Sequence, residues 1–339
     1  IMVNVGIVGV TGYTGQELVR ILIKHPKVKI SGLFSRSSYG KSARELFPEF
    51  ASSLSLVCEK PDLKNISGKC DLVFLALPHT FSMELVPGLV KAGIKVIDLS
   101  ADYRLKDIKI YTKFYAVKHK DSAGLKKAIY GLPELYRDKI RNARLLANPG
   151  CYPTAALLSL APLLVSKIVD LSSIIIDAKS GISGAGKKFA EGFLLTDAHE
   201  DFKAYKVGVH QHTPEINQEL SGLSGSKVKV VFVPHLLPIH RGILETIYLK
   251  RSKKGKAKNL FGLYKKFYNK EPFIRIKAEG EMPRIKDVSG TNFCDIGVKE
   301  DGDKIIVIGV IDNLLKGASG QAVQNMNIMS GFPESTGLL

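Results

Sequence analysis

Cysteine is scarce in this 339-residue chain. The cysteines are Cys58, Cys70, Cys151 and Cys294. Their spacings match neither a paired-CxxC metal site nor a dense disulfide framework. No apolar run is long enough to cross a bilayer. Residues 3–8 (VNVGIV) predict a strand instead of the regions of a secretory signal. We therefore expect a reduced, cytoplasmic globular protein without a metal site or a membrane partner.

Acidic residues are also few, with 32 Asp and Glu against 49 Lys and Arg, which gives a net charge of +17. Such an excess can attract nucleic acids, anionic membranes, acidic partners or anionic substrates. The densest basic run, residues 250–258 (KRSKKGKAK), has no aromatic residues between its charges for base stacking. It also matches no common nucleic-acid-binding module. We interpret it as a solvated hairpin tip and predict no nucleic-acid partner.

The first half of the chain alternates between strand-like and helix-like segments. Short apolar runs predict strands over residues 3–8, 28–34, 71–77 and 95–99, and helical periodicity predicts helices over 16–24 and 81–92. This alternation is typical of βαβ units on a parallel sheet. The sequence therefore predicts an α/β protein whose residues 1–150 form an N-terminal Rossmann-type domain, although residues 39–69 give no clear pattern.

After residue 150 the order of the segments changes. Strands are predicted over 174–179, 228–234, 243–249, 293–299 and 304–311, and helices over 257–269 and 318–329. Strands that follow one another without intervening helices indicate an antiparallel arrangement. We expect an α+β second domain over residues 151–312 with a mostly antiparallel sheet.

The most informative segment is NPGCYPTAA, residues 148–156. A Pro-Gly pair precedes Cys151, and Pro153 suits the first turn of the helix that the following apolar residues predict. The positive end of a helix dipole favours the thiolate form of a cysteine, which is the nucleophilic form. Cys151 is therefore a candidate for covalent catalysis, and a buried structural cysteine is the alternative.

A glycine-rich turn, GVTGYTG, joins the first predicted strand to the first helix. Glycines at this position let the backbone approach a pyrophosphate at the helix N-terminus. The predicted contacts are Gly9, Thr11, Gly12, Tyr13, Thr14 and Gly15. The second strand ends in Ser35 and Arg36, without the carboxylate that holds the ribose hydroxyl in NAD sites. Because the arginine fork matches a 2′-phosphate, we predict NADP(H) as the cofactor.

A cysteine combined with a nicotinamide cofactor indicates chemistry at the aldehyde oxidation level, through a thioester. This chemistry needs an acid–base group, and histidine has a suitable pKa. His210 and His212 lie close together in the sequence, but no third ligand with metal-site spacing is nearby, so a metal site is not predicted. Arg241, in PHLLPIHRG, is a candidate clamp for a substrate carboxylate or phosphate.

The chain resembles the N-acetyl-gamma-glutamyl-phosphate reductases, relatives of the aspartate-semialdehyde and glyceraldehyde-phosphate dehydrogenases. The matching segments, which span the chain, are GVTGYTGQEL (9–18), DLSADYR (98–104), NPGCYPTAA (148–156), SGISGAGK (180–187), HQHTPEI (210–216), PHLLPIHRGILET (234–246) and DNLLKGASGQAVQNMN (312–327).

The resemblance implies reduction of an acyl phosphate, N-acetyl-L-glutamyl 5-phosphate, in arginine biosynthesis. It implies Cys151 as the nucleophile and His212 as the acid–base catalyst. Residues implied to contact the cofactor are Ser180, Gly181, Gly184, Gly186, Asn313, Lys316 and Gly317. Candidates for binding the substrate are Arg104, His210 and Arg241. The resemblance also implies that residues 313–339 return to complete the first domain and that the chain forms a homo-dimer or homo-tetramer.

Two alternatives differ in substrate or in class. One is a related reductase of lysine biosynthesis that acts on an aminoadipyl-phosphate tethered to an acidic carrier protein, which the positive charge would suit. That branch departs from NPGCYPT around the cysteine and from PHLLPIHRG. The other is a non-enzymatic NADP-binding or nucleic-acid-binding protein on a dehydrogenase scaffold. It predicts loss of the catalytic residues, whereas Cys151 and His212 are both present.

Overall fold

The computed structural model describes residues 2–185, 201–252 and 259–339. The chain divides into two compact units, one made of Ile1–Pro149 with Ala318–Leu339 and the other of Gly150–Gly317. We call them the N-terminal unit and the second unit. Within the described residues, no helix combines the length and the apolar character that crossing a membrane demands.

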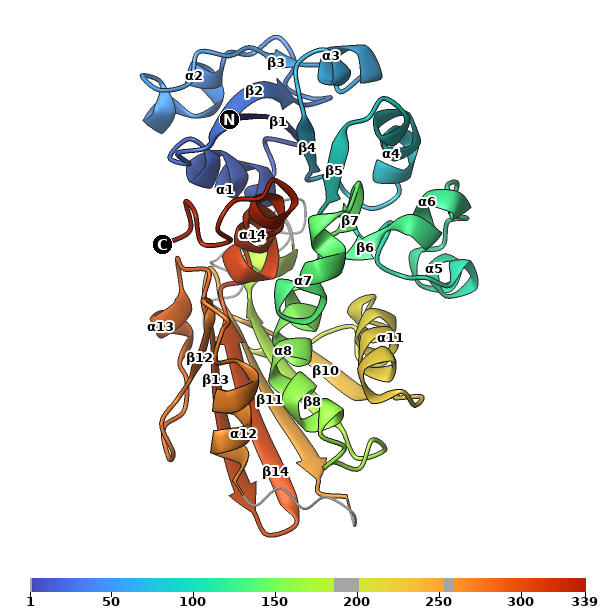
Figure 1. Cartoon of the computed structure of the whole chain (residues 1–339), viewed down its shortest axis with the longest axis vertical. Helices are drawn as coiled ribbons and strands as arrows, with labels where there is room; N and C mark the ends of the chain where they lie inside the picture. Colours follow the sequence, from blue (N-terminus) through green and yellow to red (C-terminus); the bar gives the residue numbers. More distant parts are fainter. Residues whose placement is uncertain (1, 186–200, 253–258) are drawn as a thin grey trace. The chain divides into compact units, whose positions relative to one another are not determined.

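The N-terminal unit is built on a parallel sheet with strand order β3-β2-β1-β4-β5-β7-β6 (Figure 1). Its strands are β1 (Val3–Val8), β2 (Val28–Phe34), β3 (Cys58–Glu59), β4 (Leu72–Leu75), β5 (Lys95–Asp98), β6 (Ile129–Tyr130) and β7 (Leu145–Ala147). Every pairing among them is parallel. The chain order reverses between β1 and β4, which is the position where sheets of this kind bind dinucleotides.

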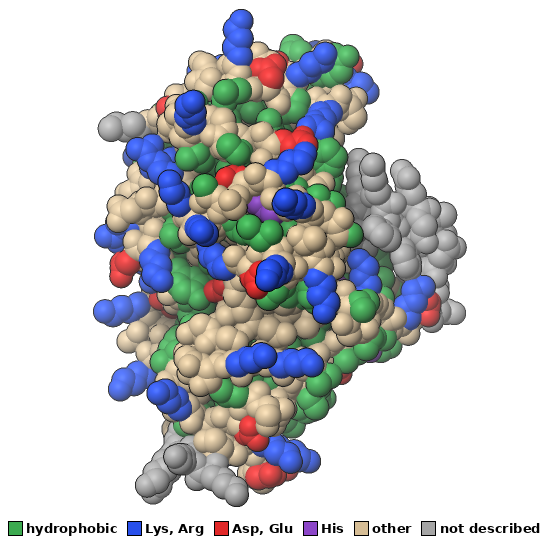
Figure 2. Space-filling model, turned by 90° about the vertical axis from the view of Figure 1, so that its right-hand side faces the viewer, with side chains coloured by type: hydrophobic (Ala, Val, Ile, Leu, Met, Phe, Trp, Pro, Cys, Tyr) green, Lys and Arg blue, Asp and Glu red, His purple; other side chains and the backbone are tan. Residues whose placement is uncertain are grey.

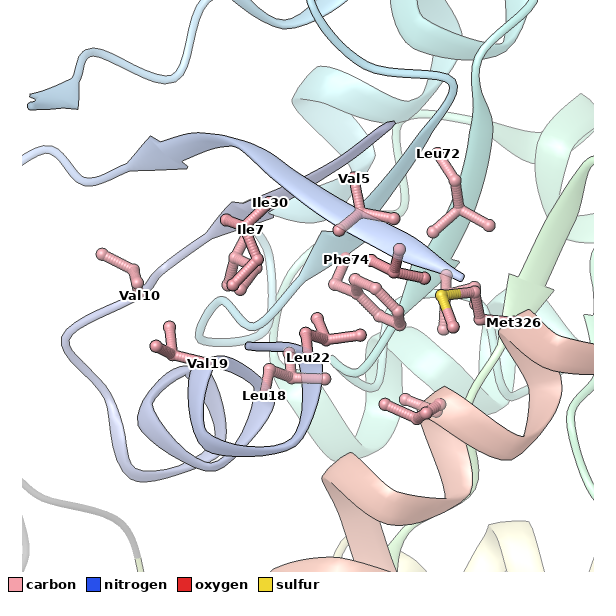
Figure 3. Close-up of a cluster of buried hydrophobic side chains, with 14 of the residues drawn as sticks. Val5, Ile7, Val10, Leu18, Val19, Leu22, Ile30, Leu72, Phe74 and Met326 are labelled. Carbon is pink, nitrogen blue, oxygen red and sulfur yellow. The ribbon is translucent and has the colours of Figure 1, made fainter. Parts of the chain in front are cut away.

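Helices cover this sheet because each places one apolar stripe against it. They are α1 (Tyr13–Leu22), α2 (Ala43–Leu46), α3 (Leu63–Ser67), α4 (Ser82–Lys91), α5 (Ile108–Tyr115), α6 (Ser122–Lys127), α7 (Pro133–Arg141) and the C-terminal α14 (Gly320–Met329). Figure 3 shows side chains of β1, β2, β4 and α1 meeting Met326 of α14 in one buried cluster. The C-terminal helix thus contributes to the core of the N-terminal unit, although some 300 residues separate it from α1 in the sequence.

The second unit has a mixed sheet with strand order β12-β13-β14-β11-β8-β10-β9. Its strands are β8 (Ile175–Gly181), β9 (Lys203–Ala204), β10 (Val231–Leu237), β11 (Ile243–Lys250), β12 (Ile274–Ile276), β13 (Cys294–Asp301) and β14 (Lys304–Ile311). The β8–β10 and β12–β13 pairs are parallel and the other pairs antiparallel. The prediction of a parallel sheet followed by a mostly antiparallel one is confirmed.

Helix α8 (Cys151–Val165) is the buried centre of the second unit and contacts β11, β14 and α11 (His212–Ser224). Helices α12 (Leu260–Phe267) and α13 (Ile285–Val288) complete the unit. Pro162 inside α8 has no N–H for the carbonyl of Leu158. The Tyr268 hydroxyl donates to that carbonyl instead, at 2.5 Å. The sequence can therefore keep a proline in a buried helix without leaving a backbone acceptor unsatisfied.

Lysine and arginine side chains are spread over the face seen in Figure 2, with a few acidic side chains between them. They do not gather into one dense patch on that face. Residues 253–258 of the basic run lie outside the described residues, so the hairpin-tip prediction stays a prediction.

Candidate active site

Cys151 is the first residue of α8. Gly150 precedes it as the N-cap, with extended backbone angles (φ −68°, ψ 156°) and no side-chain cap. The N–H groups of the first helical turn have no partner within the helix and point toward its N-terminus. Together with the helix dipole they favour a thiolate at this position. The thiol is half-buried, in contrast to the buried thiols of Cys58, Cys70 and Cys294.

The backbone on either side of the thiol is closely held. The carboxylate of Glu215, buried in α11, accepts the Gly150 N–H at 2.9 Å. A Cβ on Gly317 would lie 2.8 Å from the Cβ of Cys151, so only glycine leaves room for the cysteine there. Sequence reasoning did not identify Glu215, whose sole signal was its place in the HQHTPEI motif. Gly317 was predicted to contact the cofactor, and the structure places it against Cys151.

His212 begins α11, the helix that lies against α8. Its ring centroid is 5.9 Å from that of Tyr152, the residue after the cysteine, and 4.9 Å from that of His210. The predicted nucleophile and the predicted acid–base residue therefore begin two neighbouring helices. The N-terminal ends of both helices lie at one cluster of rings that includes Tyr152, His210 and His212.

His210 is buried in that cluster, and burial lowers its pKa to about 4. It is therefore neutral near pH 7. Its Nδ1 accepts the backbone N–H of His212 at 3.0 Å, which places the ring proton on Nε2. Nε2 lies 3.5 Å from the hydroxyl of Tyr205, which is 3.1 Å from the hydroxyl of Tyr152. His210 thus fixes the start of α11 and cannot itself carry a charge at neutral pH.

The loop after β8 carries the predicted Ser180, Gly181 and Gly184. The buried Ser180 hydroxyl donates to the carbonyl of Gly181 at 3.0 Å. A Cβ on Gly184 would lie 2.8 Å from that same hydroxyl oxygen. Gly186 and Lys187 lie outside the described residues.

The Asn313 side chain connects this loop to Gly242, the residue directly before β11. It donates to the Ser183 hydroxyl at 3.0 Å and accepts the Gly242 N–H at 2.7 Å. Arg241 pairs with the fully buried Asp312 at 3.3 Å. Asn313 therefore holds the loop in place, and Arg241 anchors the segment before β11 to Asp312.

Lys316 is completely buried, with Nζ 5.7 Å from the ring centroid of Phe273. It was predicted to contact the cofactor, and the structure places its side chain in the interior of the protein. Arg104, a candidate for binding the substrate, is also buried. It donates to the carbonyls of Asn148 at 2.8 Å and Leu99 at 2.7 Å, both in its own unit.

The glycine turn between β1 and α1 has the close approaches that a pyrophosphate cradle needs. Gly9 has φ +85°, and a Cβ there would lie 2.1 Å from the Ala76 carbonyl oxygen. A Cβ on Gly15 would lie 2.4 Å from the Gly9 carbonyl oxygen. Gly12 caps α1 without a side chain, so the N–H groups of the first turn stay open to an anion. Thr11, Tyr13 and Thr14 are only partly buried along this turn.

Ser35 and Arg36 follow β2 directly, at the carboxyl edge of the sheet. Ser35 is buried, whereas the Arg36 side chain is 54% exposed. The Arg36 guanidinium lies 4.7 Å from the ring centroid of Phe81 and 3.5 Å from a carboxylate oxygen of Glu84. The residues present therefore fit a dinucleotide that carries a 2′-phosphate: an open helix N-terminus with glycines and an exposed guanidinium at the end of the second strand.

Comparison with known proteins agrees with this arrangement. Residues 4–143 match the family model described as semialdehyde dehydrogenase, NAD binding domain, and residues 151–313 match the semialdehyde dehydrogenase dimerisation domain. The N-acetyl-gamma-glutamyl-phosphate reductase of Pelotomaculum thermopropionicum is 50% identical over 338 residues, which cover 99% of this chain and 97% of the relative. That of Geotalea daltonii is 50% identical over 340 residues, covering 99% and 98%.

Solved structures with a similar fold have far lower identity. Aspartate semialdehyde dehydrogenase II of Vibrio cholerae gives a TM-score of 0.75 at 18% identity, covering 98% of this chain and 99% of that one. Aspartate semialdehyde dehydrogenase with NADP from Candida albicans gives 0.74 at 17% identity, covering 97% and 99%. The chain thus belongs to the N-acetyl-gamma-glutamyl-phosphate reductase family of the semialdehyde dehydrogenases.

Proposed function

We propose that the protein catalyses the NADPH-dependent reduction of N-acetyl-L-glutamyl 5-phosphate to N-acetyl-L-glutamate 5-semialdehyde and phosphate, a step of arginine biosynthesis in the cytoplasm. The observation that carries the proposal is the half-buried Cys151 at the N-terminus of α8. The first residue of the neighbouring helix α11 is a histidine. The proposed reaction is the one for which relatives 50% identical over almost the whole chain are named.

The chemistry begins when the Cys151 thiolate attacks the acyl carbon. The C–O bond to phosphate then breaks, phosphate leaves, and a thioester remains on the sulfur. When bound, NADPH supplies the hydride that reduces the thioester carbonyl. The resulting hemithioacetal oxygen takes a proton from the imidazolium of His212 and returns it as the C–S bond breaks. This last step releases the aldehyde and restores the thiolate.

We assign the remaining residues by their surroundings. Gly9, Gly12 and Gly15 would hold the pyrophosphate, and Ser35 with Arg36 would hold the 2′-phosphate. The Ser180–Gly184 loop, Gly186 and Asn313 of the second unit are proposed to contact the cofactor. Lys316 and Gly317 are instead proposed to support the site from within the protein, because the first is buried and the second abuts Cys151. Binding of the substrate's anionic groups is proposed for Arg241, Arg104 and His210.

We also propose that two copies associate through the outer sheet face of the second unit. This face contains Ile175, Val231 and Tyr248, which are 42%, 56% and 42% exposed. Val231 and Tyr248 both pair with Ile175, so the three side chains form one row across three strands. An exposed apolar row on a sheet indicates an interface. The match of residues 151–313 to a dimerisation domain supports this assignment.

The test is an assay in the oxidative direction, with free N-acetylglutamate semialdehyde, phosphate and NADP⁺. We expect repeated turnover, with continued formation of NADPH, only when phosphate is present. We expect NAD⁺ to be the poorer oxidant. No turnover with the free substrate, combined with turnover of a carrier-bound acyl phosphate, would overturn the assignment to arginine biosynthesis. A preference for NAD⁺ would overturn the reading of Arg36 alone.

A further inference from the structure

Thr80 has φ +79°, a left-handed backbone conformation that a β-branched residue rarely adopts. The other non-glycine residues with positive φ in the described part of the chain are Ala116, Lys167 and Lys206. None of these three is β-branched. Strained backbone persists only where the surrounding structure holds it, and it is frequent at ligand sites. The contacts around Thr80 therefore indicate which site its strained conformation supports.

Thr80 lies in the loop between β4 and α4, at the point where the strand order of the sheet reverses. The loop begins beside the glycine turn, because the Ala76 N–H donates to the Val8 carbonyl at 2.8 Å and Gly9 lies against the Ala76 carbonyl. It ends at Phe81, whose ring lies under the Arg36 guanidinium at 4.7 Å. Both contacts belong to the dinucleotide edge of the N-terminal unit.

Two buried carboxylates hold the backbone and side chains on either side of Phe81. Asp102 accepts the Thr80 N–H at 2.7 Å through Oδ1 and the Met83 N–H at 3.3 Å through Oδ2. Asp98 accepts the Ser82 hydroxyl at 2.6 Å. Phe81 itself remains 37% exposed. The side chain that supports Arg36 is thus at the surface, but its neighbours are tied to the interior.

Asp102 is itself held in place by hydrogen bonds. It is fully buried, and the Tyr111 hydroxyl donates to its Oδ1 at 2.7 Å. Its own N–H donates to the Ser100 hydroxyl at 3.1 Å. Because this carboxylate cannot shift, the charge-assisted bond to Thr80 N–H can keep the strained conformation. Without it, Thr80 would relax to negative φ and carry Phe81 away from Arg36.

We propose that Asp102 is a positioning residue for the 2′-phosphate site, acting through the strained Thr80 to keep Phe81 under Arg36. The proposal rests on the NADP(H) binding proposed above. Arg36 also pairs with Glu84 in the first turn of α4, a helix whose start the same carboxylates hold. The orientation of the guanidinium therefore depends on two contacts, and both lie on the segment that Asp102 anchors.

The test measures binding of adenosine 2′,5′-bisphosphate, which contains the 2′-phosphate half of the cofactor only, by calorimetry. We expect Asp102→Ala to weaken binding about tenfold, which corresponds to about 1.4 kcal/mol. Thr80→Pro, which cannot adopt positive φ and has no N–H, should weaken it similarly. Adding Thr80→Gly to Asp102→Ala should recover most of the affinity, because glycine adopts φ +79° without strain.

Asp121 provides the matched control. Its carboxylate also accepts a backbone N–H, that of Gly124 at 2.8 Å, and a tyrosine hydroxyl, that of Tyr103 at 2.9 Å. It caps α6 instead of the loop after β4. We expect Asp121→Ala to lower the melting temperature of the unliganded protein but to leave the affinity for the bisphosphate within twofold.

The outcomes separate the two proposals. If the wild type binds the bisphosphate and Thr80→Pro binds it equally well, Asp102 has no positioning role, whether or not Asp102→Ala folds. If Asp102→Ala loses affinity but Thr80→Gly does not restore it, the effect does not pass through the strained residue. If the wild type does not bind adenosine 2′,5′-bisphosphate and prefers NADH, the assignment of NADP(H) fails, and this inference fails with it.

Discussion

At the scale of single residues, the proposed reactivity of Cys151 depends on the groups that hold its backbone in place. The thiol occupies the first position of α8, and its backbone is held by Glu215 on one side and limited by Gly317 on the other. Catalytic rates respond steeply to small displacements of a reacting atom. We therefore expect a change of either neighbour to lower the rate of the reaction.

Replacing Glu215 tests the first contact. Glu215→Ala removes the acceptor of the Gly150 N–H, and we expect kcat to fall about tenfold to a hundredfold. Glu215→Gln keeps an acceptor oxygen and should recover most of the rate. Glu219→Ala is the control, because Glu219 is buried one turn further along α11 and its carboxylate accepts from Gln218. Equal rate losses in the Glu215→Ala and Glu219→Ala variants would contradict the positioning role.

Replacing Gly317 tests the second contact. A methyl group there would meet the Cβ of Cys151 at 2.8 Å. We expect Gly317→Ala to destabilise the protein by about 1–3 kcal/mol in denaturant unfolding and to lower activity. Gly222→Ala, in the last turn of α11 with open space around it, should be neutral or stabilising. A Gly317→Ala variant as stable and active as the wild type would show that the helix end has more room than the structure indicates.

At the scale of elements, the buried carboxyl of Glu245 in β11 lowers the stability of the folded protein. It lies between Ala178 of β8 and Gly309 of β14, and neither of its side-chain oxygens has a hydrogen-bond partner among the described residues. Burial raises its pKa well above the ordinary value. Folding therefore favours the protonated form of this carboxyl over its charged form.

The raised pKa of Glu245 makes the stability of the protein depend on pH. Because the folded-state pKa is raised, stability is fully present below the unfolded pKa and is lost as the pH rises above it. Glu245→Gln should be more stable than the wild type by about 1–3 kcal/mol near pH 8, and the difference should shrink toward pH 4.5. Denaturant unfolding at several pH values measures it, with the exposed Glu281→Gln as the control. A difference independent of pH would show that this carboxyl does not titrate on unfolding.

The elements themselves were largely predictable, because short apolar runs such as residues 3–8, 28–34 and 304–311 favour a buried strand. Residues 39–69 were not, since their helices and strand are only a few residues long and too short to show periodicity. Glu215 was missed because its contact joins two helices 65 residues apart. Lys316 and Arg104 were predicted as ligand contacts, and no local pattern signals that their side chains are buried.

At the scale of the whole molecule, the sheet of the second unit has two different faces. Ile176, Phe232 and Ile247 are buried on the side of α8, whereas their neighbours Ile175, Val231 and Tyr248 form the exposed outer sheet face. A period of two explains the alternation, but not why the outer residues are apolar. The proposed interface with a second copy would account for the apolar outer residues.

A lysine on this face should therefore separate the copies. We expect Val231→Lys to shift the protein to monomers in size-exclusion chromatography with light scattering, because an unpaired charge would be buried in the interface. Val165→Lys, at an exposed apolar residue at the end of α8, should leave the assembly unchanged. A wild type that is monomeric at micromolar concentration would contradict the proposed interface.

The most direct test of covalent catalysis is intact-protein mass spectrometry after mixing the enzyme with N-acetylglutamate semialdehyde and NADP⁺ without phosphate. The account predicts a burst of NADPH close to one per active site and an acyl group on the peptide that contains Cys151, removed when phosphate is added. A Cys151→Ser variant should show neither. Full turnover by that variant, or an acyl group on a different residue, would contradict a thioester on Cys151.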